Sequence, residues 1–330
     1  MIFNSLSSKA RIYILTFVTL CLVLISTHSF LSVPNIHDLA STYSSGHTAH
    51  PSWLLITSSA SSDFQRRLLV RWTWVSLFGR FGIFDHIFAV SSTDPVLLPL
   101  IKKENDTFGD ILLLDHIEDT AWTANRIKPF EFFKKVTNEG WKGKTYDFVS
   151  KVDQDSFVDP VRIWNKYLKG RVSGSRDEED RLMLSMPHEA FCECPAPQGG
   201  FYTLSWDLAK VITRIYDGME KTEEFGQEDC QIGRLPTDAG EQYEFVSMDR
   251  EESFDVVGEK PNAIARDWSK EQVERGRLDK LENVAFLHQM KEEWKWLAVK
   301  DFFDEDGWVP NRSSGGSNLT SLETHTGLET

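Results

Sequence analysis

The sequence is poor in positive charge and in cysteine, and it lacks several short motifs that mark well-known enzyme classes. Its 330 residues include 36 Lys and Arg against 50 Asp and Glu, which gives a formal net charge of −14. This balance excludes a general nucleic-acid binder, because a phosphate backbone requires a basic surface. No P-loop, G-x-S-x-G elbow or H-E-x-x-H helix is present. A small anionic ligand, held by a metal ion and a few local cations, remains compatible with the composition.

Only four cysteines are present, and one of them, Cys21, lies in an apolar run. If the rest of the chain is lumenal, Cys192, Cys194 and Cys230 meet an oxidising environment. Three thiols allow at most one bridge and leave one thiol over, and the sequence does not say which pair forms. A C-x-C pair followed by a distant single cysteine is a poor zinc pattern, so we predict no zinc site.

One long hydrophobic run is present, over residues 12–31, and Lys9 and Arg11 precede it. Basic residues on this side predict a cytosolic N-terminus and a lumenal remainder, as in a single-pass type II membrane protein. We expect a signal anchor; the alternative is a cleaved signal peptide, which would give a secreted protein. Three N-x-[ST] sequons agree with a lumenal chain, at Asn105, Asn311 and Asn318.

Composition divides the chain into five segments. A hydrophobic content of 41% and an aromatic content of 12% fit one large folded domain. The polar residues on either side of this domain lack apolar periodicity and predict a stem before it and a disordered tail after it. The segments are a cytosolic tail (1–11), a transmembrane helix (12–31), a stem (32–51), the folded domain (52–305) and a C-terminal tail (306–330).

Apolar runs alternate with amphipathic segments, which predicts an α/β fold with a mainly parallel central sheet flanked by helices. A charged segment, Thr237–Lys280, has no pattern that assigns it. Strands are predicted at Trp53–Thr57, Asp85–Val90, Gly109–Leu114, Tyr146–Val152, Leu182–Met186, Phe201–Ser205 and Val284–His288. Helices are predicted from Ser61 or Asp63 to Trp74, at Val96–Lys103, Thr120–Asn138, Val161–Leu168, Trp206–Tyr216 and Glu292–Phe303, and late in Phe225–Leu235.

The fourth predicted strand runs directly into acidic residues, Asp153-Gln154-Asp155. Open α/β sheets bind ligands at the carboxyl ends of their strands. Two carboxylates one residue apart suit a hard divalent cation. The structural alternative is a strand followed by an acidic surface turn. Asp153 and Asp155 are therefore candidate metal ligands. The other residues near this edge of the sheet have to distinguish a metal site from a surface turn.

Several other residues could act at the same edge of the sheet. A late predicted strand ends at His288. This histidine could be a further metal ligand, or it could be an ordinary core or surface residue. The pair Glu228-Asp229 opens a predicted helix, and it could supply a general base or only favourable charge at a helix N-terminus. Gly199-Gly200 would permit close approach of the backbone to a ligand. The candidate cations for a diphosphate are Arg66, Arg67, Arg71, Lys128 and Lys151, with a solvated helix face as the alternative for the arginines.

These parts suit the transfer of a sugar from a nucleotide diphosphate. A divalent cation bridges such a diphosphate and neutralises the leaving group. A separate carboxylate takes the proton of an acceptor hydroxyl.

Five segments, in this order, extend the pattern over roughly Trp53–Phe303. They are RRLLVRWTW (Arg66–Trp74), FGDILLLDHIEDTAWTANRIK (Phe108–Lys128), FVSKVDQDSFV (Phe148–Val158), PQGGFYTLSWDLAKVI (Pro197–Ile212) and QEDCQIG (Gln227–Gly233). Their order resembles glycosyltransferase family 31, the β-1,3-galactosyltransferase-like and Fringe-like enzymes. The third resembles the family's K-x-D-D-D-x-F-V motif and the fifth its E-D-V-x-x-G motif. The closest similarity is to divergent fungal-type members.

The resemblance implies a GT-A fold, a type II protein of the Golgi membrane with a lumenal catalytic domain, and Mn²⁺-dependent inverting transfer from a UDP-sugar. Asp155 matches the last, metal-ligating acid of the family motif. Asp153 matches the first acid, nearer the nucleotide and the sugar. Asp229 matches the acid proposed as catalytic base, and His288 matches a late metal-binding histidine.

Two arginines also match the family, and three positions depart from it. Arg66 and Arg71 match positions near the uridine and the diphosphate. Gln154 replaces the middle acid of the triplet, Ala124 stands where the family often has Leu, and Cys230 replaces the Val after E-D.

The sequence therefore predicts an enzyme that moves a hexose, with galactose favoured, from a UDP-sugar to a hydroxyl of a glycan or glycoprotein acceptor. Its cofactor would be Mn²⁺ or another divalent cation. Its partners would be the donor, the acceptor and the membrane around the N-terminal helix, with no nucleic acid. One alternative is an inactive protein of the same fold that binds UDP-sugar or glycan, which Gln154 favours. Another is a metal-dependent phosphoesterase that uses the same acids.

Overall fold

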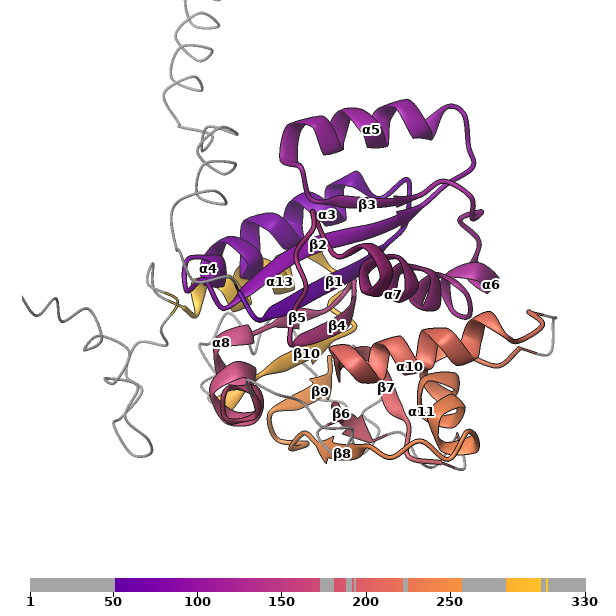
Figure 1. Ribbon diagram of the computed structural model, residues 1–330. Helices are drawn as coiled ribbons and strands as arrows, with labels where there is room; N and C mark the ends of the chain where they lie inside the picture. Colours follow the sequence, from indigo (N-terminus) through magenta and orange to yellow (C-terminus); the bar gives the residue numbers. More distant parts are fainter. Residues whose placement is uncertain are drawn as a thin grey trace, which may run out of the picture. The chain divides into compact units, whose positions relative to one another are not determined.

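The computed structural model (Figure 1) describes residues 51–172, 181–187, 192, 194–221, 225–256, 283–303 and 307. The predicted membrane helix, the stem up to residue 50, the sequons at Asn311 and Asn318 and the predicted C-terminal tail apart from Gly307 lie outside the described residues. Within the described part, no helix combines the length and the hydropathy that crossing a membrane requires.

A central sheet organises the described domain. Its strands, in order across the sheet, are β3 (Ile111–Leu114), β2 (Phe84–Ser91), β1 (Trp53–Ser59), β4 (Phe148–Asp153), β7 (Pro197–Ser205), β6 (Leu182–Pro187) and β8 (Glu244–Ser247). Neighbouring strands are parallel except where β7 pairs with β4 and with β6. This arrangement confirms the predicted α/β class with a mainly parallel sheet.

Helices cover both faces of this sheet (Figure 1). They are α3 (Phe64–Val70), α4 (Ser76–Gly79), α5 (Leu97–Phe108), α6 (Ala121–Ala124), α7 (Lys128–Glu139), α8 (Pro160–Ile163), α10 (Trp206–Asp217), α11 (Glu228–Asp238) and α13 (Glu293–Asp301). Trp53 and Leu55 of β1 pack in one core with α3, α4 and α13, whereas Leu54 and Ile56 pack in the other with α7, α10 and α11. Burial on both faces explains why the parallel strands read as continuous apolar runs.

A smaller sheet of three short strands lies at the carboxyl end of β4. Its order is β5 (Phe157–Val158), β10 (Phe286–His288) and β9 (Ser253–Asp255), with β10 antiparallel to β5 and parallel to β9. Because β5 begins two residues after Asp155, its pairing with β10 brings His288 to the acids that follow β4. The sequence predicted β10 but missed β5, β8 and β9, since strands of two to four residues are too short to show alternation.

Two arginines point inward, Arg67 on helix α3 and Arg71 directly after it. Asp63 caps the helix, because its side chain accepts a hydrogen bond from the Arg66 backbone N–H (3.1 Å). Arg67 and Arg71 are only 1% and 5% exposed, and both pair with Glu104. A solvated helix face is therefore the wrong description for these two arginines. The large apolar side chains exposed along this stretch are those of Phe64, Leu68 and Trp72, spaced four residues apart.

The predicted helix Thr120–Asn138 is interrupted, so that α6 and α7 are separate. The Thr120 side chain caps α6. Pro129 lies in the first turn of α7 and does not kink the middle of a helix. Proline is favoured in a first turn because its missing N–H would have no partner within the helix there.

The sequon at Asn105 lies inside α5, whereas the sequence predicted it after the helix. The Asn105 side-chain oxygen accepts a hydrogen bond from the Ile111 backbone N–H (2.9 Å) at the start of β3. Gly109 ends the helix in the left-handed region, with φ of 69°. Asn105 therefore joins the end of α5 to the next strand.

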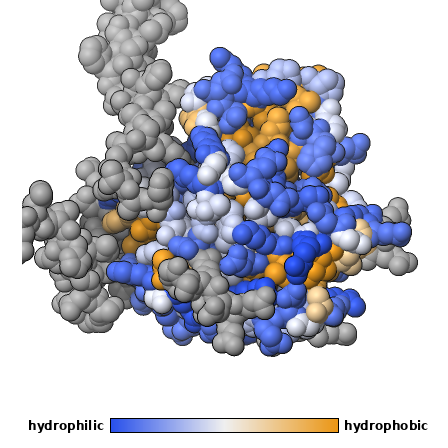
Figure 2. Space-filling view, viewed as in Figure 1, coloured by the Kyte–Doolittle hydropathy of each residue, from blue (hydrophilic) through white to orange (hydrophobic). Residues whose placement is uncertain are grey.

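The face drawn in Figure 2 is mainly hydrophilic, in agreement with a charged content of 26%. Apolar residues are visible in the upper part of this view, where Figure 1 places α5. Val96 and Leu100 are the most exposed large apolar side chains of that region, at 71% and 63%. Isolated apolar side chains on a surface are common and indicate no partner by themselves.

Candidate functional site

Asp153, Asp155 and His288 come together at the carboxyl end of β4. Asp153 is the last residue of β4, Asp155 lies in the turn that follows, and His288 ends β10. The Nε2 atom of His288 lies 3.6 Å from Asp153 Oδ2 and 3.5 Å from Asp155 Oδ1. One ligand atom from each residue lies within 4.8 Å of the other two, so a single ion could contact all three. The fold thus assembles the three predicted metal ligands, which we call the acidic cluster.

The acidic cluster fits a divalent cation of the Mn²⁺ type, which accepts carboxylate oxygen and imidazole nitrogen as ligands. Burial opposes a charge on His288, but hydrogen bonds to three carboxylates, that of Asp153 first, raise its pKa to about 11. Burial also works to raise the pKa of Asp153, but Lys151 and His288 hold that pKa below its ordinary value of 3.8. The electrostatics therefore favour a positive charge between the carboxylates, either a proton on His288 or a cation.

The other ring nitrogen of His288 faces a third carboxylate. Its Nδ1 atom lies 2.8 Å from Asp255 Oδ1. Gln198 donates to the same oxygen (2.9 Å), and Gln289 donates to Asp255 Oδ2 (3.2 Å). The ring is therefore held from behind while Nε2 faces the acidic cluster.

Lys151 lies buried beside the acidic cluster, between two carboxylates and a backbone carbonyl. Its Nζ atom lies 2.9 Å from Asp153 Oδ1 and 3.2 Å from Glu228 Oε1, and it donates to the Gly199 carbonyl. Its predicted contact with a diphosphate remains a prediction. Lys151 ties β4, β7 and α11 together.

Of the acidic pair that opens α11, Asp229 is the more accessible. Glu228 is 6% exposed and is engaged by Lys151. Burial is the main cause that raises the pKa of Glu228, to about 7. Asp229 is half-buried, and its Oδ2 atom lies 3.5 Å from the point where a Cβ on Gly199 would stand. Asp229 is thus the less buried member of the pair.

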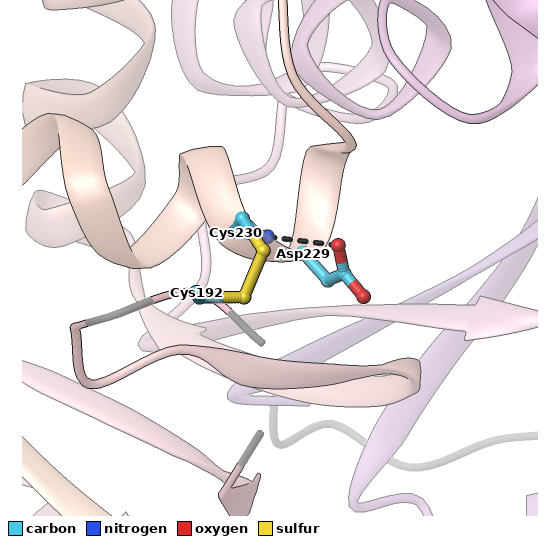
Figure 3. Close-up of a disulfide and its surroundings, with 3 residues drawn as sticks. All are labelled: Cys192, Asp229 and Cys230. Carbon is cyan, nitrogen blue, oxygen red and sulfur yellow. Dashed lines mark hydrogen bonds between the residues drawn. A yellow bond between two sulfur atoms is a disulfide. The ribbon is translucent and has the colours of Figure 1, made fainter. Parts of the chain in front are cut away.

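A disulfide between Cys192 and Cys230 fixes the first turn of α11 (Figure 3). Figure 3 shows Asp229 beside it, with Oδ1 accepting a hydrogen bond from the Cys230 backbone N–H (2.8 Å). Cys194 is the free thiol among the described cysteines. One bridge with one thiol left over was predicted, whereas the choice of pair is decided by the fold. Since the two sulfur atoms are bonded to each other, their proximity to Asp229 does not make a metal site.

The glycine pair lies within β7, not in a loop, and its two members have different neighbours. A Cβ on Gly200 would stand 2.7 Å from His288 Cγ, which is shorter than any ordinary contact. A Cβ on Gly199 would meet its nearest atom, Asp229 Oδ2, at 3.5 Å. Gly200 therefore makes room for the protein's own His288, while Gly199 lies between Asp229 and Lys151.

The predicted diphosphate cations do not all reach the acidic cluster. The Arg71 guanidinium is bound by Asp110 (2.8 Å) and Glu104 (2.7 Å) within the core, so the geometry gives no support to its predicted contact with a donor. Arg66 donates to the carbonyls of Met290 (3.0 Å) and Lys291 (2.8 Å). It thereby holds the segment after His288 against α3, and its predicted contact with the donor is untested.

Lys128 lies at the carboxyl end of β1 but is buried there. Its Nζ atom donates to the Ser59 carbonyl (2.6 Å) and lies 3.7 Å from Asp119 Oδ1. Burial is the dominant cause that lowers its pKa to about 8. Its predicted contact with a diphosphate remains a prediction.

Gln154 is turned toward the loop after β1. Its Oε1 atom accepts a hydrogen bond from the Ala60 backbone N–H (3.0 Å), and its Nε2 atom donates to Asp63 Oδ2 (3.2 Å). An acid at this position would face the carboxylate of Asp63. The missing middle acid is thus explained by a local contact that fixes the turn between the two outer acids.

Sequence reasoning missed Asp255 and Gln198, the residues behind His288. The segment around β9 reads SFDVV, and it was left unassigned. Its signal is weak, because β9 holds only one apolar residue, Phe254, before the acid. Gln198 had no comparable signal, because only the pairing of β6, β7 and β4 places it near His288.

Comparisons with known proteins leave the family open. No protein-family model matches the chain, and none of the curated proteins matches its sequence. One similar solved structure is described as a glycosyltransferase involved in the glycosylation of the major capsid of PBCV-1, with 9% identity and a TM-score of 0.40 over 74% of this chain and 97% of that chain. Another is the apo structure of the WbbM bifunctional glycosyltransferase, with 8% identity and a TM-score of 0.41 over 75% of this chain and 47% of that chain. The chain therefore spans about half of the second structure, and no residue role follows from likenesses this distant.

Proposed function

We propose that this protein is a metal-dependent glycosyltransferase that moves a hexose from a UDP-sugar to a hydroxyl of a glycan or glycoprotein, with inversion at the anomeric carbon. The observation that carries the proposal is the acidic cluster of Asp153, Asp155 and His288 at the carboxyl end of β4, with Asp229 beside it across Gly199. A cation site and an accessible carboxylate at one edge of a mainly parallel sheet are what this reaction requires.

The acidic cluster would hold a divalent cation through two carboxylates and the Nε2 atom of His288. When bound there, such a cation would supply positive charge that neutralises a diphosphate leaving group. Asp229 would accept the proton of the acceptor hydroxyl as its oxygen attacks the anomeric carbon. The bond from that carbon to UDP breaks on the opposite face, and this in-line displacement inverts the anomeric centre.

The finer assignment rests on the sequence motifs. Membership in glycosyltransferase family 31, a GT-A fold, a preference for galactose and a place in the Golgi membrane as a type II protein belong to this proposal because the five ordered segments resemble that family. The two similar structures bear glycosyltransferase titles, but the proposal does not rest on them, since both TM-scores are below 0.5.

The test is release of UDP by the full chain in detergent, with Mn²⁺, a panel of UDP-sugars and a panel of glycan acceptors. Asp155→Asn should lower the turnover by more than about a hundredfold. Replacing a residue that only hydrogen-bonds to a metal ligand already lowers metal affinity or activity by about 10–100-fold. Asp85→Asn is the matched control, since Asp85 lies at the opposite end of the parallel strands, on β2. Turnover that survives a chelator, or survives Asp155→Asn in a folded protein, contradicts the role of the metal.

The inactive binding protein is the main alternative. In the sequence, Gln154 favoured this alternative. In the structure, the Gln154 side chain forms hydrogen bonds with Ala60 and Asp63. Binding of UDP without turnover across all donors and acceptors would support this alternative. Turnover with water as the sole acceptor would support a phosphoesterase.

A further inference from the structure

On the side that faces away from the acidic cluster, His288 contacts a carboxylate that is itself held by hydrogen bonds. Asp255 Oδ1 lies 2.8 Å from His288 Nδ1. Both Asp255 oxygens accept further hydrogen bonds, from Gln198 and from Gln289. A carboxylate fixed in this way has little freedom to turn away from the imidazole.

The backbone next to His288 is held in an unusual conformation. Gln289 has a φ of 61°, in the left-handed region that residues other than glycine rarely adopt. Such conformations persist where the surroundings enforce them, and they are found preferentially at functional sites. Here the strained residue directs its side-chain amide back to Asp255.

The opposite side of the ring is fixed by packing. Gly200 leaves room for His288 to lie directly on the backbone of β7, where a Cβ would come within 2.7 Å of the ring. Phe286 stacks on the ring at a centroid distance of 6.0 Å and an interplanar angle of 16°. Hydrogen bonding at Nδ1 and packing on the ring therefore determine its orientation together.

We propose that Asp255 is a positioning residue of the cation site, which holds the proton of His288 on Nδ1 and so presents the lone pair of Nε2 to a divalent cation between Asp153 and Asp155. A carboxylate behind a metal-binding imidazole fixes its tautomer and raises its basicity. Asp255 touches neither the cation nor a substrate. This inference rests on the cation site of the proposed function, and it adds a residue that the sequence motifs do not contain.

The experiment measures the affinity of the apo, full-length chain for Mn²⁺ by titration calorimetry. Asp255→Asn removes the acceptor and keeps the shape of the side chain, and it should weaken Mn²⁺ binding by about 10–100-fold. Asp85→Asn changes the same atoms at the far end of β2 and should leave the affinity unchanged. Asp155→Asn tests the cation site itself. Asp255→Glu keeps the carboxylate and should recover part of the affinity.

A second measurement separates positioning from a general effect on folding. The ¹⁵N chemical shifts of labelled histidines, assigned by comparison with His288→Gln, report which ring nitrogen carries the proton when diamagnetic Mg²⁺ is bound. The wild-type chain should hold the proton on Nδ1, and Asp255→Asn should give a mixture of tautomers. If Asp255→Asn does not fold, Gln198→Leu removes a donor to Asp255 Oδ1, together with a 3.4 Å contact to His288 Nδ1, and should weaken Mn²⁺ binding by about fivefold.

The outcomes are distinct. If Asp155→Asn weakens Mn²⁺ binding while Asp255→Asn and Gln198→Leu do not, the cation site stands and the positioning role of Asp255 is refuted. If Asp155→Asn has no effect on Mn²⁺ binding, the cation site of the proposed function fails. A loss of affinity in Asp255→Asn with an unchanged tautomer also refutes the positioning role.

Discussion

Replacing Gly200 with alanine provides a sharp test of how the acidic cluster is built. The added Cβ would stand 2.7 Å from His288 Cγ and 2.8 Å from His288 Cδ2, whereas ordinary contacts begin near 3.4 Å. The ring would have to move by about 0.7 Å, the difference between 3.4 and 2.7 Å. Asp255 holds the ring by its hydrogen bond to Nδ1, so the ring cannot move freely. We therefore expect Gly200→Ala to disturb the cation site more than the fold.

Two magnitudes follow from this overlap. Overpacking by one methyl group costs about 1–3 kcal/mol of folding free energy, and alanine recovers about 0.5–1 kcal/mol by restricting the unfolded chain. The net loss of stability should be about 1 kcal/mol. A metal site tolerates displacements of only about 0.5 Å, so Mn²⁺ affinity should fall by about tenfold or more.

Gly199→Ala is the matched control in the adjacent position of the same strand. Its Cβ would find its nearest neighbour at 3.5 Å, an ordinary contact, and neither glycine has a positive φ. Stability should stay constant or rise slightly, and Mn²⁺ affinity should not change. The assays are urea denaturation for the free energy of unfolding and calorimetry for the affinity. Equal Mn²⁺ affinities for the two alanine variants would refute the reasoning about His288, as would a loss that is larger for Gly199→Ala.

Three further predictions concern residues around the acidic cluster. Lys151→Met removes the counter-ion of two carboxylates and should lower the free energy of unfolding in urea by about 3 kcal/mol; a loss below about 1 kcal/mol would contradict the network. Lys128 has a pKa lowered from 10.5 to about 8, so the unfolded chain binds this proton more tightly. As the pH rises between these two values, the free energy of unfolding of the wild type should increase relative to that of Lys128→Met, by roughly 3 kcal/mol in total. Parallel pH profiles of the two proteins would contradict the lowered pKa. The Cys192–Cys230 bridge spans a sequence separation of 38 residues. Its removal by serine at both positions should cost about 2–4 kcal/mol, and dithiothreitol should then destabilise the wild type but not the double variant.

Local patterns were sufficient where a segment is buried on both faces or ends at a clear cap. β1, β2, β4, β6 and α10 lie where the apolar runs and the helix signals place them, because continuous burial leaves a strong hydrophobic signal. The same reasoning failed for the helix predicted over Thr120–Asn138, because Pro129 favours the first turn of a new helix. It also failed for the inward arginines, whose partner Glu104 lies on another helix.

The candidate site shows the same division between local and distant information. Asp153 and Asp155 are visible in the sequence, because they follow a strand directly. His288 was identified at the end of a strand, but its proximity to the acids depends on the pairing of β5 with β10. Lys151 was predicted to contact a ligand, and only the tertiary structure shows that it lies against Glu228 and Gly199, both distant in the sequence.

The sequence alone determined the α/β class, the mainly parallel sheet, the acids at the end of the fourth strand and the number of bridges that three cysteines can form. These features depend on periodicity, composition and neighbours in the chain, which are local. The tertiary structure decided which cysteines pair, which cations are buried in ion pairs, and that Asp255 lies behind His288. Those facts depend on contacts between segments far apart in the chain, such as the parallel pairing of β9 with β10, and no local pattern encodes the register of such a pairing.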